Sequence, residues 1–159
     1  MHRPWTRGRL KQRAITLNPY LGYEAIEPFL IDPDHAVFLL CKSSNPGAAD
    51  LQEALLYNGE KFYELVAQLA QKWNQKGNIG LVVGATYPDS LARVRIKAPD
   101  MWILAPGIGT QGGDIKATLH VGLREDGLGL LVNVSRSISR SENPRNAALE
   151  IREAINKER

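Results

Sequence analysis

The sequence is poor in the residues that build disulfide frameworks, metal sites and membrane spans. A single cysteine, Cys41, stands among 159 residues, which excludes an internal disulfide framework. The histidines His2, His35 and His120 show no paired spacing, and no metal-binding motif is present, so no metal and no cofactor is expected. No apolar run approaches the roughly 18 residues that cross a bilayer, so a membrane partner is not expected either.

Neither sign of charge dominates, because the sequence has 20 basic and 17 acidic residues. This mild excess permits an anionic ligand without indicating one. The first thirteen residues are basic, with one aromatic residue and no periodicity. We interpret residues 1–13 as a basic N-terminal appendage, in preference to a nucleic-acid-binding arm. No signal-like apolar block follows its charges, so a cytoplasmic location is expected.

From residue 14 onward, short apolar runs alternate with amphipathic stretches. This alternation is typical of βα units, whose parallel strands are apolar on both faces. The expected strands are Ala14 to Leu17, Ala36 to Cys41, Ile79 to Val83, Met101 to Leu104 and Leu128 to Val134. A short helix is expected over Tyr23 to Leu30, and others over Phe62 to Trp73, after Pro88, from Asp114, and from Asn143 with Ala147, Ala148, Ile151 and Ile155 buried. Residues 14–159 therefore form one domain of the α/β class.

The loop that follows the fourth expected strand, residues 105–114, is rich in glycine. Gly107, Gly109, Gly112 and Gly113 can adopt positive φ and let the backbone approach a ligand, which favours an anion such as phosphate. Residues 107–112 also match the dinucleotide pattern G-x-G-x-x-G, but the next strand does not end in the acidic residue that binds a ribose hydroxyl. The pattern therefore predicts a phosphate site without a dinucleotide.

Arg136 follows the last expected strand, where barrels often place the second half of a phosphate site. Its guanidinium could hold a phosphate with two hydrogen bonds, or it could pair with Glu142 at the surface. The neighbouring glycine-rich loop favours phosphate, and Arg140 is expected at the surface.

Together the segments PGIGTQGGD (106–114) and VSRSI (134–138) resemble the paired phosphate-binding loops of orotidine 5′-phosphate decarboxylase. The segments TLNPYLG (16–22), CKSSNPG (41–47) and GLVVGAT (80–86) are similar to strands four, five and six of a bacterial subgroup of that family. In that subgroup the enzyme stands alone or is fused to orotate phosphoribosyltransferase. The resemblance implies the C-terminal part of a TIM (β/α)₈ barrel, about five parallel strands with alternating helices.

By this resemblance, Gln111 and Arg136 bind the phosphate of orotidine or uridine 5′-monophosphate, with Pro106 and the amides of Gly112 and Gly113 nearby. Ser44 contacts the pyrimidine, and Ser43 or Asn45 remain alternatives. Ser135 departs from the glycine expected before the arginine and crowds the loop.

The resemblance also implies that the catalytic groups are missing from this chain. The family protonates the pyrimidine with a lysine in an Asp-x-Lys-x-x-Asp element on strand three, and the first matched strand here is the fourth. Asp114 and Lys116 reproduce the Asp-x-Lys spacing, but Leu119 stands where the second aspartate belongs. We expect Asp114 to cap a helix and Lys116 to be exposed.

Three functions are compatible with the sequence. The chain works only as part of a complete decarboxylase, it is a non-catalytic module that binds nucleotide monophosphates, or it is another phosphate-binding barrel enzyme. Five parallel strands cannot close a cylinder of eight. We therefore expect the chain to need the missing half or to self-associate as a homodimer or larger assembly.

Overall fold

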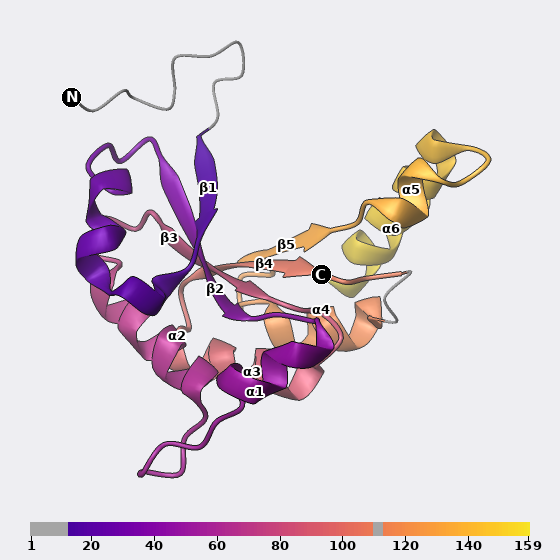
Figure 1. Cartoon of the computed structure of the whole chain (residues 1–159). Coiled ribbons are helices and arrows are strands. Elements are labelled where there is room, and N and C mark those ends of the chain that lie inside the picture. The colour runs from indigo at the N-terminus through magenta and orange to yellow at the C-terminus, as the bar shows by residue number, and fades with distance from the viewer. Residues whose placement is uncertain (1–12, 110–112) are drawn as a thin grey trace.

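The computed structural model describes residues 13–109 and 113–159, and within these ranges the chain forms one parallel sheet. Its strand order, β1-β2-β3-β4-β5, follows the sequence. The strands are β1 (Ala14–Leu17), β2 (Ala36–Lys42), β3 (Ile79–Val83), β4 (Trp102–Pro106) and β5 (Leu130–Asn133). A curved sheet of sequential parallel strands joined by helices is part of a (β/α)₈ barrel, which confirms the predicted fold class (Figure 1).

Helices cover one side of this sheet, as Figure 1 shows for α1 to α4. The predicted helices correspond to α2 (Phe62–Trp73), α3 (Pro88–Lys97), α4 (Ile115–Gly122) and α6 (Pro144–Glu158). Two one-turn helices, α1 (Ala49–Gln52) and α5 (Arg136–Ser139), were not predicted, because four residues are too few to show a helical period.

The expected helix over Tyr23 to Leu30 is wrong. The β1–β2 connection instead contains the 3₁₀ turns η1 (Pro19–Leu21), η2 (Tyr23–Ala25) and η3 (Glu27–Phe29). Gly22 has a φ of 87°, which interrupts the helical geometry between η1 and η2. Pro28 has no N–H to donate, and the hydrogen bonds of this segment span three residues, such as the one from Leu30 N–H to Glu27 O.

The main core lies between the sheet and the helices. Val37, Leu39 and Cys41 of β2 point to this side and are buried. The Cys41 thiol donates to the backbone oxygen of Tyr63 in α2 at 3.2 Å, and burial raises the pKa of the thiol, so it stays protonated at neutral pH. Cys41 is therefore a core residue.

The opposite face of the sheet is only partly covered. Leu40, Trp102 and Leu131, from three different strands, keep exposed fractions of 38%, 39% and 41%. Their positions alternate with the buried residues of the helix side, as the two-residue period of a strand requires. In a complete barrel such residues fill the interior.

Arg95 of α3 joins the amino-terminal ends of β4 and β5 to α4. Burial lowers its pKa to about 10, so the guanidinium is still charged at neutral pH. It donates hydrogen bonds to the backbone oxygens of Ala98, Pro99, Met101, Gly122 and Gly129. This one side chain therefore ties together backbone oxygens at the strand and helix ends, of which those of Ala98 and Gly129 also accept from a backbone N–H.

The apolar stripe of α6 is less buried than predicted. Among the described residues, none of this helix is fully buried, and Ala147, Ile151 and Ile155 are half-buried. Ala148 is exposed, and Leu149 is half-buried in its place. The helix packs against α4 and α5 on one side only, which explains the partial cover.

Candidate functional site

The candidate site lies at the carboxyl edge of the sheet, where parallel strands place all the loops that follow them. Four loops meet this edge: residues 43–45 after β2, 84–87 after β3, 107–109 and 113–114 after β4, and 134–135 after β5. The described site residues predicted from the sequence, Ser44, Pro106, Gly113 and Arg136, belong to three of these loops or to the elements beside them. Gln111 and Gly112 lie outside the described residues.

The glycine-rich loop folds back on itself. Gly107 and Gly109 have φ values of 107° and 85°, as predicted, whereas Gly113 does not adopt a positive φ. Gly113 N–H donates to Gly107 O at 3.1 Å, and a Cβ on Gly113 would lie 2.7 Å from that same oxygen. The amide of Gly113 is therefore engaged inside the loop in this structure, and glycine is needed at position 113 for the close approach.

The glycine-rich loop also packs against α5. A Cβ on Gly109 would lie 2.3 Å from the hydroxyl oxygen of Ser137. Arg136 is the first residue of α5 and is exposed, directly before Ser137. The structure thus brings the loop after β4 and the arginine after β5 to the same place.

The β3 loop connects this region to Ser44. A Cβ on Gly84 would lie 3.1 Å from the Ser44 Cβ, and one on Gly113 would lie 3.1 Å from the Ala85 Cβ. Ala85 N–H donates to Pro106 O at 2.8 Å. Ser44, the β3 loop and the glycine-rich loop therefore form one continuous row along the edge.

Asp114 caps α4, as predicted. Its carboxylate accepts hydrogen bonds from the N–H groups of Lys116 and Ala117, at 2.8 and 3.3 Å. The Lys116 side chain is 69% exposed and lies 3.3 Å from Glu158 of α6. This placement confirms that Lys116 is a surface residue of the first helical turn.

The loop after β2 is fixed by a side chain that the sequence did not indicate, Gln52 of α1. The Gln52 Oε1 atom accepts from Ser43 N–H at 2.8 Å, and its Nε2 atom lies 3.0 Å from the Ser43 Oγ. Ser43 Oγ in turn lies 2.6 Å from Asn45 Oδ1. Predicting this contact would have required a predicted helix over residues 49–52, and four residues are too few to show a helical period.

A buried lysine, Lys42, directly precedes the same loop. It is 2% exposed, and its Nζ atom lies 3.3 Å from Glu53 and 4.4 Å from the centre of the Tyr87 ring. Lys61 also binds Glu53, at 2.7 Å. Hydrogen bonds from Lys61 and Lys42 lower the pKa of Glu53, so this carboxylate is ionised at neutral pH and balances the buried charge.

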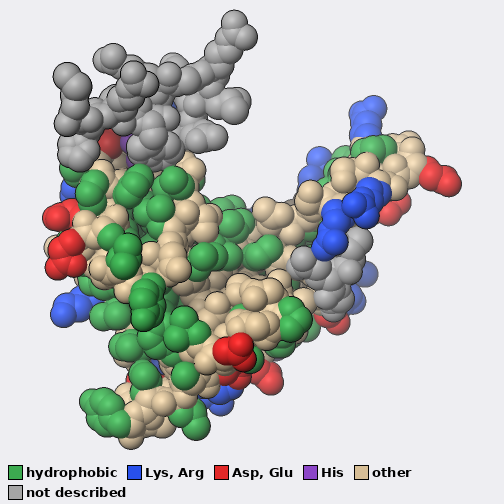
Figure 2. Space-filling model, viewed as in Figure 1, with side chains coloured by type: hydrophobic (Ala, Val, Ile, Leu, Met, Phe, Trp, Pro, Cys, Tyr) green, Lys and Arg blue, Asp and Glu red, His purple; other side chains and the backbone are tan. Residues whose placement is uncertain are grey.

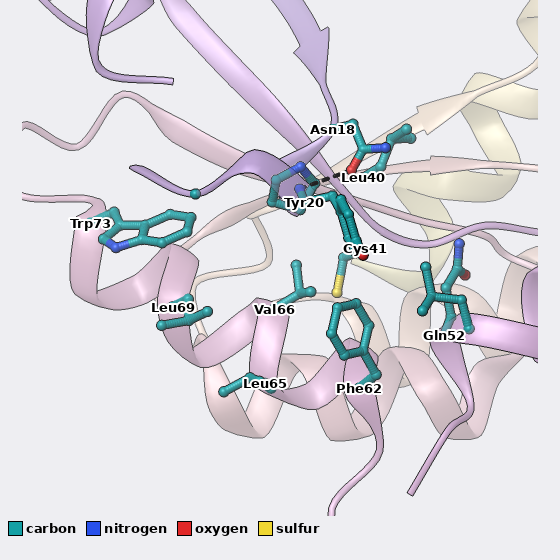
Figure 3. A pocket seen from close by; sticks show the side chains of 13 residues that line it. Asn18, Tyr20, Leu40, Cys41, Gln52, Phe62, Leu65, Val66, Leu69 and Trp73 are labelled. Carbon is teal, nitrogen blue, oxygen red and sulfur yellow. Dashed lines mark hydrogen bonds between the residues drawn. The ribbon is translucent and has the colours of Figure 1, made fainter. Parts of the chain in front are cut away.

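A cavity of about 330 Å³ lies between the turn after β1 and helix α2 (Figure 3). Apolar α2 side chains such as Phe62, Val66 and Trp73 line it, and Gln52 stands at one end. Its lining contains no charged side chain, so it does not suit a phosphate. It exists because the 3₁₀ turns of the β1–β2 connection cover the α2 stripe incompletely.

The surface near α5 and α6 carries charges of both signs. Figure 2 shows Lys and Arg side chains beside Asp and Glu side chains at this end of the molecule, and Arg136, Arg140 and Arg145 are exposed. In the part of the chain that the structure describes, no three His, Cys, Asp or Glu side chains are grouped to hold a metal ion. Over the same residues, no helix has both the length and the apolar character that a bilayer crossing requires.

The fold and this edge define a class of α/β barrel proteins that bind their ligands on the loops after the strands. The chain belongs to the orotidine 5′-phosphate decarboxylase / HUMPS family, whose model matches residues 6–151. This match confirms the resemblance seen in the sequence motifs.

Individual relatives agree with this assignment. The chain is 51% identical to an orotidine 5′-phosphate decarboxylase of Roseiflexus castenholzii over 151 residues, 90% of this chain and 56% of the relative. The solved UMP synthase of Leishmania donovani is 52% identical with a TM-score of 0.90, covering 93% of this chain and 33% of that one. The solved OMP decarboxylase of the same organism is 50% identical with a TM-score of 0.87, covering 92% and 57%. The chain thus spans about half the length of the curated relatives it matches.

Proposed function

We propose that this chain supplies the phosphate- and pyrimidine-binding part of an orotidine 5′-phosphate decarboxylase, the enzyme that converts orotidine 5′-monophosphate to uridine 5′-monophosphate and CO₂. Family membership supports this activity. The observation that carries the proposal is the contact between Gly109 and Ser137, because it joins the glycine-rich loop to the helix that bears Arg136.

The phosphate is bound between that loop and α5. The Arg136 guanidinium holds two phosphate oxygens, and Gln111 with the amide of Gly112 completes the shell from the loop. Gly113 and Pro106 act through the backbone. The bond from Gly113 N–H to Gly107 O and the bond from Ala85 N–H to Pro106 O hold the loop in the shape that the phosphate requires.

The pyrimidine lies at the other end of the row, against Ser44 and its neighbours Ser43 and Asn45. Gly84 supports this assignment, since its missing side chain lets the backbone of Ser44 approach the β3 loop closely. A ligand that spans from Ser44 to Arg136 crosses the β3 loop on the way, which suits an elongated nucleotide.

We infer that these 159 residues do not decarboxylate by themselves. The reaction leaves negative charge on C6 of the pyrimidine, and a lysine among carboxylates must stabilise and protonate that carbon. The sequence holds no Asp-x-Lys-x-x-Asp element, and its partial match at Asp114 is explained by the helix cap.

The partner of this chain is the segment that completes the barrel, or another copy of the chain in a homodimer or larger assembly. The half-exposed Leu40, Trp102 and Leu131 support this proposal, because they present apolar surface on the face that a complete barrel encloses. Sedimentation at several concentrations tests it. Association is expected, and a monodisperse monomer at all concentrations would argue against it.

A titration with uridine 5′-monophosphate tests the binding site. We expect micromolar binding that Arg136→Ala weakens by about 100-fold or more, because a bidentate charged contact is lost. Arg140→Ala, four residues along the same exposed surface, is the matched control and leaves the affinity unchanged. Absence of binding by the wild-type chain would contradict the proposed function.

A further inference from the structure

The side-chain amide of Gln52 in α1 can adopt only one orientation towards the loop after β2, and this orientation fixes which atoms of the loop donate and which accept. The Ser43 backbone N–H can only donate, so the atom 2.8 Å from it must be the Gln52 carbonyl oxygen. The other end of the same amide, Nε2, then faces Ser43 Oγ at 3.0 Å and donates to it. One backbone group therefore determines the orientation of the whole Gln52 amide.

The direction continues through the hydroxyl of Ser43. This oxygen accepts from Gln52 Nε2 at 3.0 Å, and its own hydrogen points to Asn45 Oδ1 at 2.6 Å, which is nearer than the other acceptor within reach, Gln52 Oε1 at 3.4 Å. The Asn45 amide is thereby oriented with its oxygen towards Ser43. Its NH₂ group is the end that remains for a ligand, and NH₂ is a donor only.

We propose that Gln52 is a positioning residue that makes the β2 loop a hydrogen-bond donor and so selects a pyrimidine with a carbonyl group at C4. This inference rests on the proposed function, since it takes the loop of Ser43, Ser44 and Asn45 as the pyrimidine contact. Uracil and orotate carry an oxygen at C4, which accepts from such a donor. Cytosine carries an amino group there, which would face another donor.

Gln52 acts on the ligand through Ser43, because both ends of its amide are hydrogen-bonded to that residue. Its side chain is used on Ser43 twice, and it sits on the one-turn helix α1 behind the loop. Gly84 fixes the loop from the opposite side through its contact with Ser44. Substitutions at position 52 should therefore change the relative affinity for different pyrimidines without changing the affinity for the phosphate group.

The test measures the affinities of the full chain for uridine 5′-monophosphate, cytidine 5′-monophosphate and ribose 5-phosphate. Gln52→Leu removes both hydrogen bonds at similar volume. Gln52→Glu keeps the acceptor for Ser43 N–H but replaces the Nε2 donor by a carboxylate oxygen, so the Ser43 hydroxyl can turn its hydrogen towards position 52 while the backbone anchor stays. Gln68→Leu is the control, because Gln68 also bonds a neighbouring side chain, Glu60, but lies on α2 away from the loop.

Wild type and Gln68→Leu should prefer the uridine nucleotide. Both Gln52 variants should lower that preference by about three- to tenfold, the worth of one hydrogen bond, with ribose 5-phosphate affinity unchanged. A preference that stays unchanged in both Gln52 variants, while binding still depends on Arg136, would overturn this inference alone. Failure of the wild-type chain to bind either nucleotide would overturn it together with the proposed function.

Discussion

Gly109 and Ser137 lie so close that a methyl group on Gly109 would come within 2.3 Å of the Ser137 hydroxyl oxygen. The contact joins two segments that are distant in sequence, the loop after β4 and helix α5. It therefore determines where Arg136 stands relative to the glycine-rich loop.

Gly109→Ala should separate these two segments. The substitution places a side chain at a φ of 85°, which costs about 1–2 kcal/mol, and it also pushes α5 away. We expect the affinity for uridine 5′-monophosphate to fall by about tenfold or more. Gly59→Ala is the matched control, with a φ of 81° and open space around the new methyl group, so it shares the strain but leaves binding intact. Equal affinities for the two variants would contradict the role of the contact.

Arg95→Met should strongly destabilise the fold without touching the site. The variant removes the guanidinium that donates to the backbone oxygens of Met101 and Gly122, among others, which costs on the order of 3–5 kcal/mol. Urea unfolding measures the loss. Arg152→Met, at an exposed position of α6, should change the unfolding free energy by less than about 0.5 kcal/mol.

The stability of the chain should decrease in acid partly through Glu53. Hydrogen bonds from Lys61 and Lys42 hold its pKa below the ordinary value of 4.5, so the folded state binds its proton less readily than the unfolded state. Its contribution is complete above about pH 4.5 and is lost as the pH falls through the lower folded value. Glu53→Gln should be less stable at pH 7 and should lose less stability between pH 5 and 3.

The control for this pH series is Glu153→Gln, on the exposed surface of α6. It should follow the wild-type curve of unfolding free energy against pH. If Glu53→Gln also followed that curve, the buried charge of Lys42 would have to be balanced in another way.

Lys116→Met should leave nucleotide binding unchanged. The lysine is exposed and pairs with Glu158, and its neighbour Asp114 is occupied with capping α4. A titration with uridine 5′-monophosphate checks this, with Arg136→Ala as the variant that does lose binding. A large loss in Lys116→Met would mean that this lysine reaches the ligand.

Much of the sheet could be predicted from apolar runs. β1 and β3 were predicted to the residue, because their runs end at polar or glycine positions. β5 is shorter than predicted, since Gly129 has a φ of 84° that no strand residue adopts. β4 extends to Pro106, its last residue, whose oxygen accepts a hydrogen bond from Ala85 N–H.

The site was predictable where it depends on loops that follow strands, and less so where it depends on contacts between them. Because both segments follow strands of a parallel sheet, their positions in the sequence already place the glycine-rich loop and Arg136 at the same edge. The orientation of the Ser43 loop comes from Gln52, on a helix too short to show a period. The engaged amide of Gly113 results from the loop folding back on Gly107, which composition does not reveal.

Release of CO₂ from orotidine 5′-monophosphate tests whether catalysis needs groups that this chain does not contain. The measurement compares the chain alone with the chain mixed with the remaining segment of a close relative, the segment that carries Asp-x-Lys-x-x-Asp. We expect no release above background from the chain alone, and release from the mixture that Arg136→Ala abolishes. Turnover by the chain alone would contradict it, because a proton donor would then exist within these 159 residues.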